Sequence, residues 1–169
     1  DGHDGAGALS VTLGGATAIC YLGEGHKGDG ASFDRFGFLN VMKSADDAGE
    51  VWLDNVSVLG ERDDFSRDPG WDGINNRRTF VTTRIRPAFD FGYSPTQYAG
   101  GRSRGEIGGV TFRGDGRRAE SMGYYGDRLE ILDLTKPLKA SGRICLRRAA
   151  SDSTTLLGFF RAESAAGGY

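Results

Sequence analysis

Four carboxylates between residues 63 and 72 could bind a hard metal ion. They belong to Asp63, Asp64, Asp68 and Asp72. Calcium takes its ligands from carboxylate and carbonyl oxygens, so a cluster of aspartates in an irregular loop is a candidate site. The spacing lacks the Asp-x-Asp-x-Asp-Gly order of an EF-hand loop. Two interpretations stay open: a calcium site, or aspartates that cap turns by accepting hydrogen bonds from nearby backbone N–H groups.

Aromatic and acidic residues near expected turns and strand ends could bind a carbohydrate. Sugar rings present apolar C–H faces that stack on Trp and Tyr, while their hydroxyls hydrogen-bond to carboxylates and guanidinium groups. The residues that we expect to bind such a ligand are Trp71, Tyr93, Tyr98, Glu106, Tyr124, Tyr125 and Asp127. Each also has a structural interpretation, as a core side chain, a turn or a solvated strand residue.

A catalytic carboxylate pair is not encoded as a local motif. Glycosidases place two carboxylates on either side of the scissile bond, and the sequence has no Glu-x-Asp-x-x-Glu run. Glu106 follows Gly105 and precedes Ile107 and Gly108-Gly109, so it could stand in an uncrowded groove as a catalytic acid. Alternatively it is a solvent-facing strand residue or an ion-pair partner of Arg102 or Arg104. The sequence leaves enzymatic activity open.

Composition narrows the class of protein. Glycine makes up 28 of the 169 residues, with four prolines, against a typical glycine share of about 7%. The glycines follow no fixed period, so we expect them in turns between short strands. The formal net charge of −2 gives no basic field for nucleic acid, and no apolar run is long enough to insert into a membrane.

Alternation of apolar and polar residues predicts β-strands along the whole chain. We expect strands at 8–13, 16–22, 36–42, 50–59, 78–86, 88–93, 106–113, 120–125, 129–134, 142–147 and 154–161. Gly14-Gly15 predicts a hairpin, and Phe89 and Phe91 predict a core-facing strand. No long segment has apolar residues at helical spacing. The fold class is therefore all-β, an antiparallel sandwich.

A domain boundary is expected near residue 60. The strand at 51–58 is followed by an irregular acidic loop, so we divide the chain into residues 1–60 and residues 61–169. On a regular strand, Trp52, Asp54 and Val56 share one face, and Asp54 could face inward to hold the amides of a neighbouring loop. Cys20 and Cys145 fall on opposite sides of the boundary, so we favour two buried thiols over an inter-domain disulfide.

Two segments resemble the last strands of a known kind of domain. Residues 33–40, Phe-Asp-Arg-Phe-Gly-Phe-Leu-Asn, and residues 51–56, Val-Trp-Leu-Asp-Asn-Val, are similar to the end of a concanavalin-A-like, laminin-G-like jelly roll of secreted bacterial carbohydrate-active proteins. Residues 63–77 resemble the opening of a second such domain. The resemblance implies that 1–60 is the C-terminal part of one jelly roll and that 61–169 is most of another, truncated at its C-terminus.

The resemblance and the residues together predict a carbohydrate-binding region of a larger exported protein, extracellular or periplasmic. The expected partners are a carbohydrate and other domains of the parent chain, with no nucleic acid and no membrane insertion, and calcium is the expected ion. Because this superfamily contains lectins, hydrolases and lyases, its fold does not choose an activity. A glycoside hydrolase or polysaccharide lyase is one alternative, and a structural or protein-interaction sandwich is another.

Overall fold

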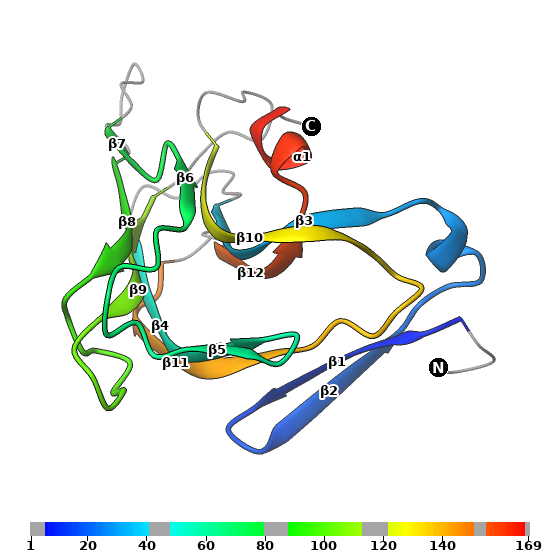
Figure 1. Ribbon diagram of the computed structural model, residues 1–169, viewed down its shortest axis with the longest axis horizontal. Coiled ribbons are helices and arrows are strands. Elements are labelled where there is room, and N and C mark those ends of the chain that lie inside the picture. Colours follow the sequence, from blue (N-terminus) through cyan, green and yellow to red (C-terminus); the bar gives the residue numbers. More distant parts are fainter. Residues whose placement is uncertain (1–5, 41–47, 80–87, 113–121, 151–154, 168–169) are drawn as a thin grey trace.

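The structure is an all-β protein in which antiparallel sheets pack together (Figure 1). It is a computed structural model that describes residues 6–40, 48–79, 88–112, 122–150 and 155–167. A four-stranded sheet and a six-stranded sheet form the body, and one hairpin projects from it. The predicted all-β class and antiparallel pairing are confirmed.

The strands of each sheet are not in chain order. The four-stranded sheet runs β12 (Thr155–Phe160), β3 (Ser32–Asn40), β10 (Gly123–Asp133) and β6 (Asp72–Ile74). The six-stranded sheet runs β11 (Ala140–Arg148), β4 (Gly49–Val58), β9 (Glu106–Thr111), β8 (Ala88–Ser94) and β7 (Arg77–Thr79), with β5 (Glu61–Asp63) paired to β4. The projecting hairpin is β1 (Ala8–Leu13) with β2 (Ala16–Tyr21), and the short helix α1 spans Ala162–Gly167.

One hydrophobic core fills the space between the sheets. Side chains of a β-strand alternate between its two faces, so every second residue of each central strand points inward. Phe36 and Phe38 come from β3, and Phe89 and Phe91 come from β8, all of them buried. The remaining buried members are Val51, Leu53, Val56, Val58, Phe65, Ile107 and Tyr125. Each fully buried large side chain contributes about 1.5–3 kcal/mol, and the prediction for Phe89 and Phe91 is confirmed.

The strands do not divide at residue 60. Residue 60 lies in the turn between β4 and β5, which pair with each other. On the N-terminal side, β3 pairs with β10 and β12, and β4 pairs with β9 and β11. Both sides also contribute to the same core. Within the described residues, strand pairing and the core therefore continue across residue 60, where an acidic loop at a hairpin looks like a linker in sequence.

Strand β4 contains a bulge that the regular pattern does not reveal. Two residues of β4, Asn55 and Val56, lie opposite the single residue Gly142 of β11. A bulge shifts the alternation by one position, and Asn55 has a positive φ of 50°, which Asn tolerates. Val56 therefore points into the core, while Trp52 packs outside it. The expectation that these two side chains share a face is wrong.

Most expected strands are present, with three differences. Strand β10 is continuous where two strands were expected, β5 and β6 are short strands that the pattern did not indicate, and α1 is a short helix that the pattern did not indicate either. The expected strand residues 41–42, 80–86, 113, 120–121 and 154 lie outside the described residues. Tertiary contacts rather than local pattern decide all three differences.

Both cysteines carry free thiols. Cys20 is exposed on β2, and Cys145 is partly exposed on β11. The expectation of two buried thiols is wrong, and the two residues are not joined by a disulfide.

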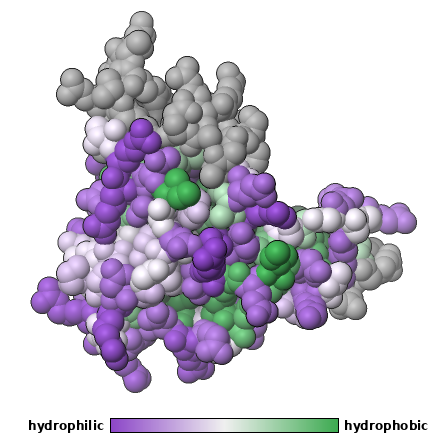
Figure 2. All heavy atoms as spheres, turned by 45° about the horizontal axis from the view of Figure 1, so that its top comes forward, coloured by the Kyte–Doolittle hydropathy of each residue, from purple (hydrophilic) through white to green (hydrophobic). Residues whose placement is uncertain are grey.

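The face of the molecule in Figure 2 is largely hydrophilic, with hydrophobic atoms gathered in compact patches. Within the described part of the chain, no helix has the length and apolar character needed to cross a bilayer.

Candidate functional site

Helix α1, which follows β12, packs against the outer face of the four-stranded sheet. A second buried cluster lies there, formed by Leu39, Met122, Tyr124 and Ala165 with Phe160 and Ala162 packed beside it. The carboxylate of Asp34 accepts the backbone N–H of Ala162 at 2.8 Å, which satisfies one of the N–H groups left open at a helix start. Alanine favours the helix that follows. Asp34 thus fixes where α1 begins over β3.

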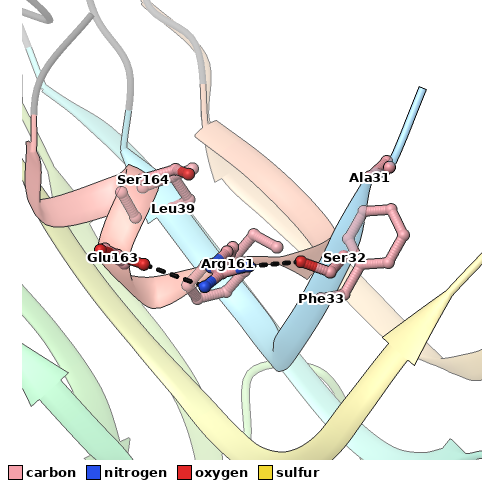
Figure 3. A pocket seen from close by; sticks show the side chains of 10 residues that line it. Ala31, Ser32, Phe33, Leu39, Arg161, Glu163 and Ser164 are labelled. Atoms are coloured by element: carbon pink, nitrogen blue, oxygen red, sulfur yellow. Dashed lines mark hydrogen bonds and ion pairs between the residues drawn. The ribbon is translucent and has the colours of Figure 1, made fainter.

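A pocket of about 530 Å³ opens between α1 and β3 (Figure 3). Its lining residues are Gly30, Ala31, Ser32, Phe33, Leu39, Phe160, Arg161, Glu163, Ser164 and Ala165. We call it the α1 pocket. Phe33 and Phe160 supply aromatic walls, and two serines, one arginine and one glutamate supply polar groups. The volume falls within the range of about 300–1,000 Å³ that is typical of small-molecule sites.

Arg161 lies at the centre of the α1 pocket (Figure 3). Its Nη1 donates a hydrogen bond to Oγ of Ser32 at 2.6 Å, and its Nη2 donates to Oε2 of Glu163 at 3.0 Å. The side chains of Arg161 and Glu163 are 46% and 81% exposed, so solvent screens the ion pair and its contribution to stability is small. A guanidinium has five N–H donors. Arg161 therefore keeps donors for a ligand.

Of the residues that the sequence predicted to bind a ligand, only Tyr124 lies next to the α1 pocket. Its ring packs edge-on against Phe160, with centroids 5.3 Å apart, and it is buried. Burial raises the pKa of the Tyr124 hydroxyl. Tyr124 supports the pocket wall and does not line the pocket.

Trp71, Tyr93 and Tyr125 meet elsewhere, at the edge of the core. The Trp71 ring lies 5.8 Å from Tyr125 and 5.5 Å from Phe65, centroid to centroid. Trp71 and Tyr93 are half-buried against the core cluster. Burial raises the pKa of Tyr125 to about 12, and the nearby Asp68 adds to the shift. The structure brings these three predicted residues together, but largely as packed side chains.

Glu106 holds the loop that connects β8 to β9. The side chain is fully buried, and its Oε1 and Oε2 accept the backbone N–H groups of Tyr98 and Ala99, each at 2.7 Å. Glu106 therefore neither stands in an open groove nor faces solvent, so both of these expectations are wrong. Carboxylates commonly satisfy loop amides in this way, because a charged acceptor strengthens the hydrogen bond.

The ring of Tyr98 already has neighbours on the outer face of the six-stranded sheet. Its centroid is 5.1 Å from that of Trp52, and the guanidinium carbon of Arg147 lies 3.9 Å from its centroid. Nη1 of Arg147 also donates to Glu50 at 3.1 Å. Arg147 therefore already covers one face of the Tyr98 ring.

Asp54 contributes a second buried carboxylate beneath the same loop. Its Oδ1 accepts the backbone N–H of Asn55 at 2.6 Å, and Oδ2 lies against the main chain of Gly101 without a fully formed hydrogen bond. Burial raises the pKa of Asp54, and the carboxylate of Glu106 raises it further. Asp54 is therefore buried on the Trp52 face of the six-stranded sheet, outside the core between the sheets.

Asp127 is half-buried on β10. Burial is the main cause of its raised pKa; the hydrogen bond from the backbone N–H of Arg128 opposes the shift, and the charge of Asp63 adds to it. Asp127 does not line the α1 pocket. The structure therefore places Asp127 outside that pocket.

The four aspartates of segment 63–72 have separate partners. Asp63, Asp64 and Asp68 each accept a backbone N–H two residues further along, at 2.7, 3.0 and 2.9 Å. Asp72 pairs with Arg35 at 2.8 Å. Across the described residues, no three His, Cys, Asp or Glu side chains form a group that could hold a metal ion. These contacts favour the turn-capping interpretation for Asp63, Asp64 and Asp68.

Sequence reasoning missed Phe33, Arg161 and Glu163 as a site. Arg161 bonds to Ser32, which lies 129 positions away in the chain. Only the pairing of β12 with β3 brings them together. The available signals were weak: Phe33 belongs to the segment that carries the family resemblance, and Arg161 is one of many arginines.

Comparison with known proteins assigns no role to the α1 pocket. No protein-family model, curated protein or solved structure matches this chain. The resemblance to concanavalin-A-like domains therefore stays a prediction from the sequence, and the function must be argued from the pocket's own chemistry.

Proposed function

We propose that this protein binds a carbohydrate in the α1 pocket. The observation that carries the proposal is the position of Arg161, held between Ser32 and Glu163 beside aromatic side chains in a pocket of about 530 Å³. This combination of an aromatic wall with charged hydrogen-bonding groups suits a sugar ring. The proposal keeps the predicted ligand class and moves the site away from the predicted residues.

Each part of a sugar finds a matching group in the pocket. The ring C–H face can pack on Phe33, which is half-buried at the pocket edge. Ring hydroxyls can accept hydrogen bonds from the remaining donors of Arg161 and donate to the carboxylate of Glu163. Because the Arg161–Glu163 ion pair is exposed to solvent, it contributes little free energy. A ligand can therefore replace this ion pair with its own hydrogen bonds at a small energetic cost.

Binding without cleavage is the activity that these residues support best. Glycoside hydrolysis through a carboxylate pair requires two acidic groups on opposite sides of the bond. Among the described residues that line the pocket, Glu163 is the one acidic residue. The hydrolase and lyase alternatives would need a second group beyond these described lining residues.

We further infer a jelly-roll arrangement and an exported location, extracellular or periplasmic. Two packed antiparallel sheets with non-sequential neighbours are compatible with a jelly roll, and the location follows from the family resemblance alone. Calcium remains a separate proposal, tested by the same binding experiment.

A glycan-array screen of the chain, run with and without calcium, tests the function. We expect retention of one glycan class by the wild-type chain and loss of that retention in Phe33→Ala. Ile131→Ala is the matched control, because Ile131 is an exposed apolar residue of β10 that does not line the pocket. No retention of any glycan, or equal retention by Phe33→Ala, would contradict the proposal. Retention that requires calcium would support the metal expectation.

A further inference from the structure

The hairpin β1–β2 presents an apolar face that nothing in the described structure covers. Its register places Leu9 opposite Cys20, Val11 opposite Ala18 and Leu13 opposite Ala16. These six side chains share one face, since cross-strand partners point to the same side of a sheet. The hairpin residues are all exposed, with Val11 and Leu13 each at 67%.

An isolated two-stranded hairpin of this kind is marginal in water. Neither β1 nor β2 pairs with any other described strand, and Figure 1 shows the hairpin projecting from the body of the sandwich. Neither strand carries a charged residue. Natural proteins protect exposed strands with charges, prolines or covering elements. A bare apolar hairpin therefore indicates an arm that binds another surface.

The same chain carries an apolar surface that matches the arm. β11 is the terminal strand of the six-stranded sheet, so one of its edges pairs with no other described strand. Ile144 and Leu146 of β11 lie opposite the core residues Leu53 and Val51 and point to the inter-sheet side. They are nevertheless 44% and 65% exposed. The edge of the hydrophobic core along β11 is therefore exposed to solvent.

The terminal strand of the opposite sheet shows the same feature. Leu157 of β12 lies opposite the core residue Phe38 and is 38% exposed. The other ends of the two sheets approach each other where Nδ2 of Asn76 donates to the carbonyl of Phe91. The β11 and β12 ends therefore form the open side of the sandwich. We call Ile144, Leu146 and Leu157 the open seam.

We propose that the β1–β2 arm of a second copy of this chain adds to the free edge of β11 and covers the open seam. Strand addition satisfies the unpaired edge, while the apolar arm face closes the core. In a two-fold dimer each copy gives its arm and receives the other. Six large aliphatic side chains from each copy are then buried, which with the added backbone brings the interface to roughly the 1,000 Å² that specific association needs.

Sedimentation velocity of the full 169-residue chain tests the dimer. We expect a concentration-dependent dimer for the wild type and at least a tenfold weaker self-association for Val11→Asp. Ser10→Asp is the matched control, because Ser10 lies on the opposite face of β1, and it should remain dimeric. A monomeric wild type at about 100 μM, or equal loss in both variants with unchanged circular dichroism, would overturn the proposal.

A disulfide test identifies which surfaces meet. In a Cys145→Ser background, Ile144→Cys places a thiol in the open seam, where Cys20 of the second copy's arm should reach it. We expect a covalent dimer on a non-reducing gel. Arg147→Cys, on the outer face of β11, should give far less dimer. A disulfide formed within one chain, or equal dimer from both positions, would overturn the exchange.

Discussion

The carboxylate of Glu106 accepts the backbone N–H of Tyr98 at 2.7 Å, and the whole Glu106 side chain is buried. Its second oxygen accepts the N–H of Ala99, and Nε of Arg143 donates to the carbonyl of Ala99 at 3.1 Å. The loop between β8 and β9 is therefore fixed to the sheet by a charged side chain inside the protein. An unpaired buried carboxylate would be costly, so the loop and Glu106 require each other.

Glu106→Gln tests this relationship. The amide keeps one acceptor but places an NH₂ group against a backbone N–H, so we expect a loss of about 1–3 kcal/mol in the free energy of unfolding. The amide protons of Tyr98 and Ala99 should also exchange faster with solvent. Glu130→Gln, at an exposed position of β10, should change neither quantity. Unchanged amide exchange in Glu106→Gln would show that the carboxylate does not hold the loop.

The turn between β4 and β5 should accept a stabilising substitution. Leu59 and Gly60 both have positive φ, at 53° and 101°, as in the two-residue turns where Asn-Gly is preferred. Leu59 is 42% exposed, so little packing is lost when it is replaced. We expect Leu59→Asn to raise the free energy of unfolding by about 1 kcal/mol. Urea unfolding measures this. Leu59→Ala keeps the unfavourable φ, and a similar gain from it would contradict the explanation.

Asp127 should make stability depend on pH. Burial raises its pKa above the ordinary 3.8, so the folded protein binds this proton more tightly than the unfolded chain does. The stabilising contribution is therefore complete below pH 3.8 and is lost as pH rises through the raised pKa. We expect Asp127→Asn to be more stable than wild type at neutral pH, with the difference vanishing in acid.

Asp133 on the same strand provides a control of opposite sign. Hydrogen bonds from the hydroxyl and backbone N–H of Thr135 lower its pKa, so its contribution is present above pH 3.8 and is lost as pH falls through the lowered pKa. Asp133→Asn should be the less stable protein at neutral pH. Urea unfolding from pH 3 to 8 compares the two variants. A pH-independent difference for Asp127→Asn would refute the burial argument.

Parts of this fold were predictable because local pattern decides them. Gly14-Gly15 gives the hairpin, and the alternation through Phe89 and Phe91 gives a core-facing strand. Which side chains of β4 face the core after Asn55 was not predictable, because the bulge at Asn55 depends on the pairing of β4 with β11. The strand pairing across residue 60 was not predictable for a related reason: a hairpin turn and a domain linker have the same composition.

The candidate site was less predictable than the fold. Tyr124 and Tyr125 have the residue type of a sugar platform, yet both are buried. Whether an aromatic residue faces solvent depends on which elements lie beside it, and Tyr124 packs against Phe160 of β12, a strand that pairs with β3 rather than with β10. Arg161 gains its position in the same way. Residue type alone therefore predicted neither the position of the pocket nor the residues that line it.

The most direct test of carbohydrate binding is a calorimetric titration with the glycan that the array retains best. Arg161→Ala removes the central donor of the α1 pocket, and we expect affinity to fall at least tenfold, a loss of about 1.4 kcal/mol or more. Arg128→Ala is the control, because Arg128 is an exposed arginine of β10 that does not line the pocket, and its affinity should match the wild type. Equal affinity of Arg161→Ala and wild type would contradict the account.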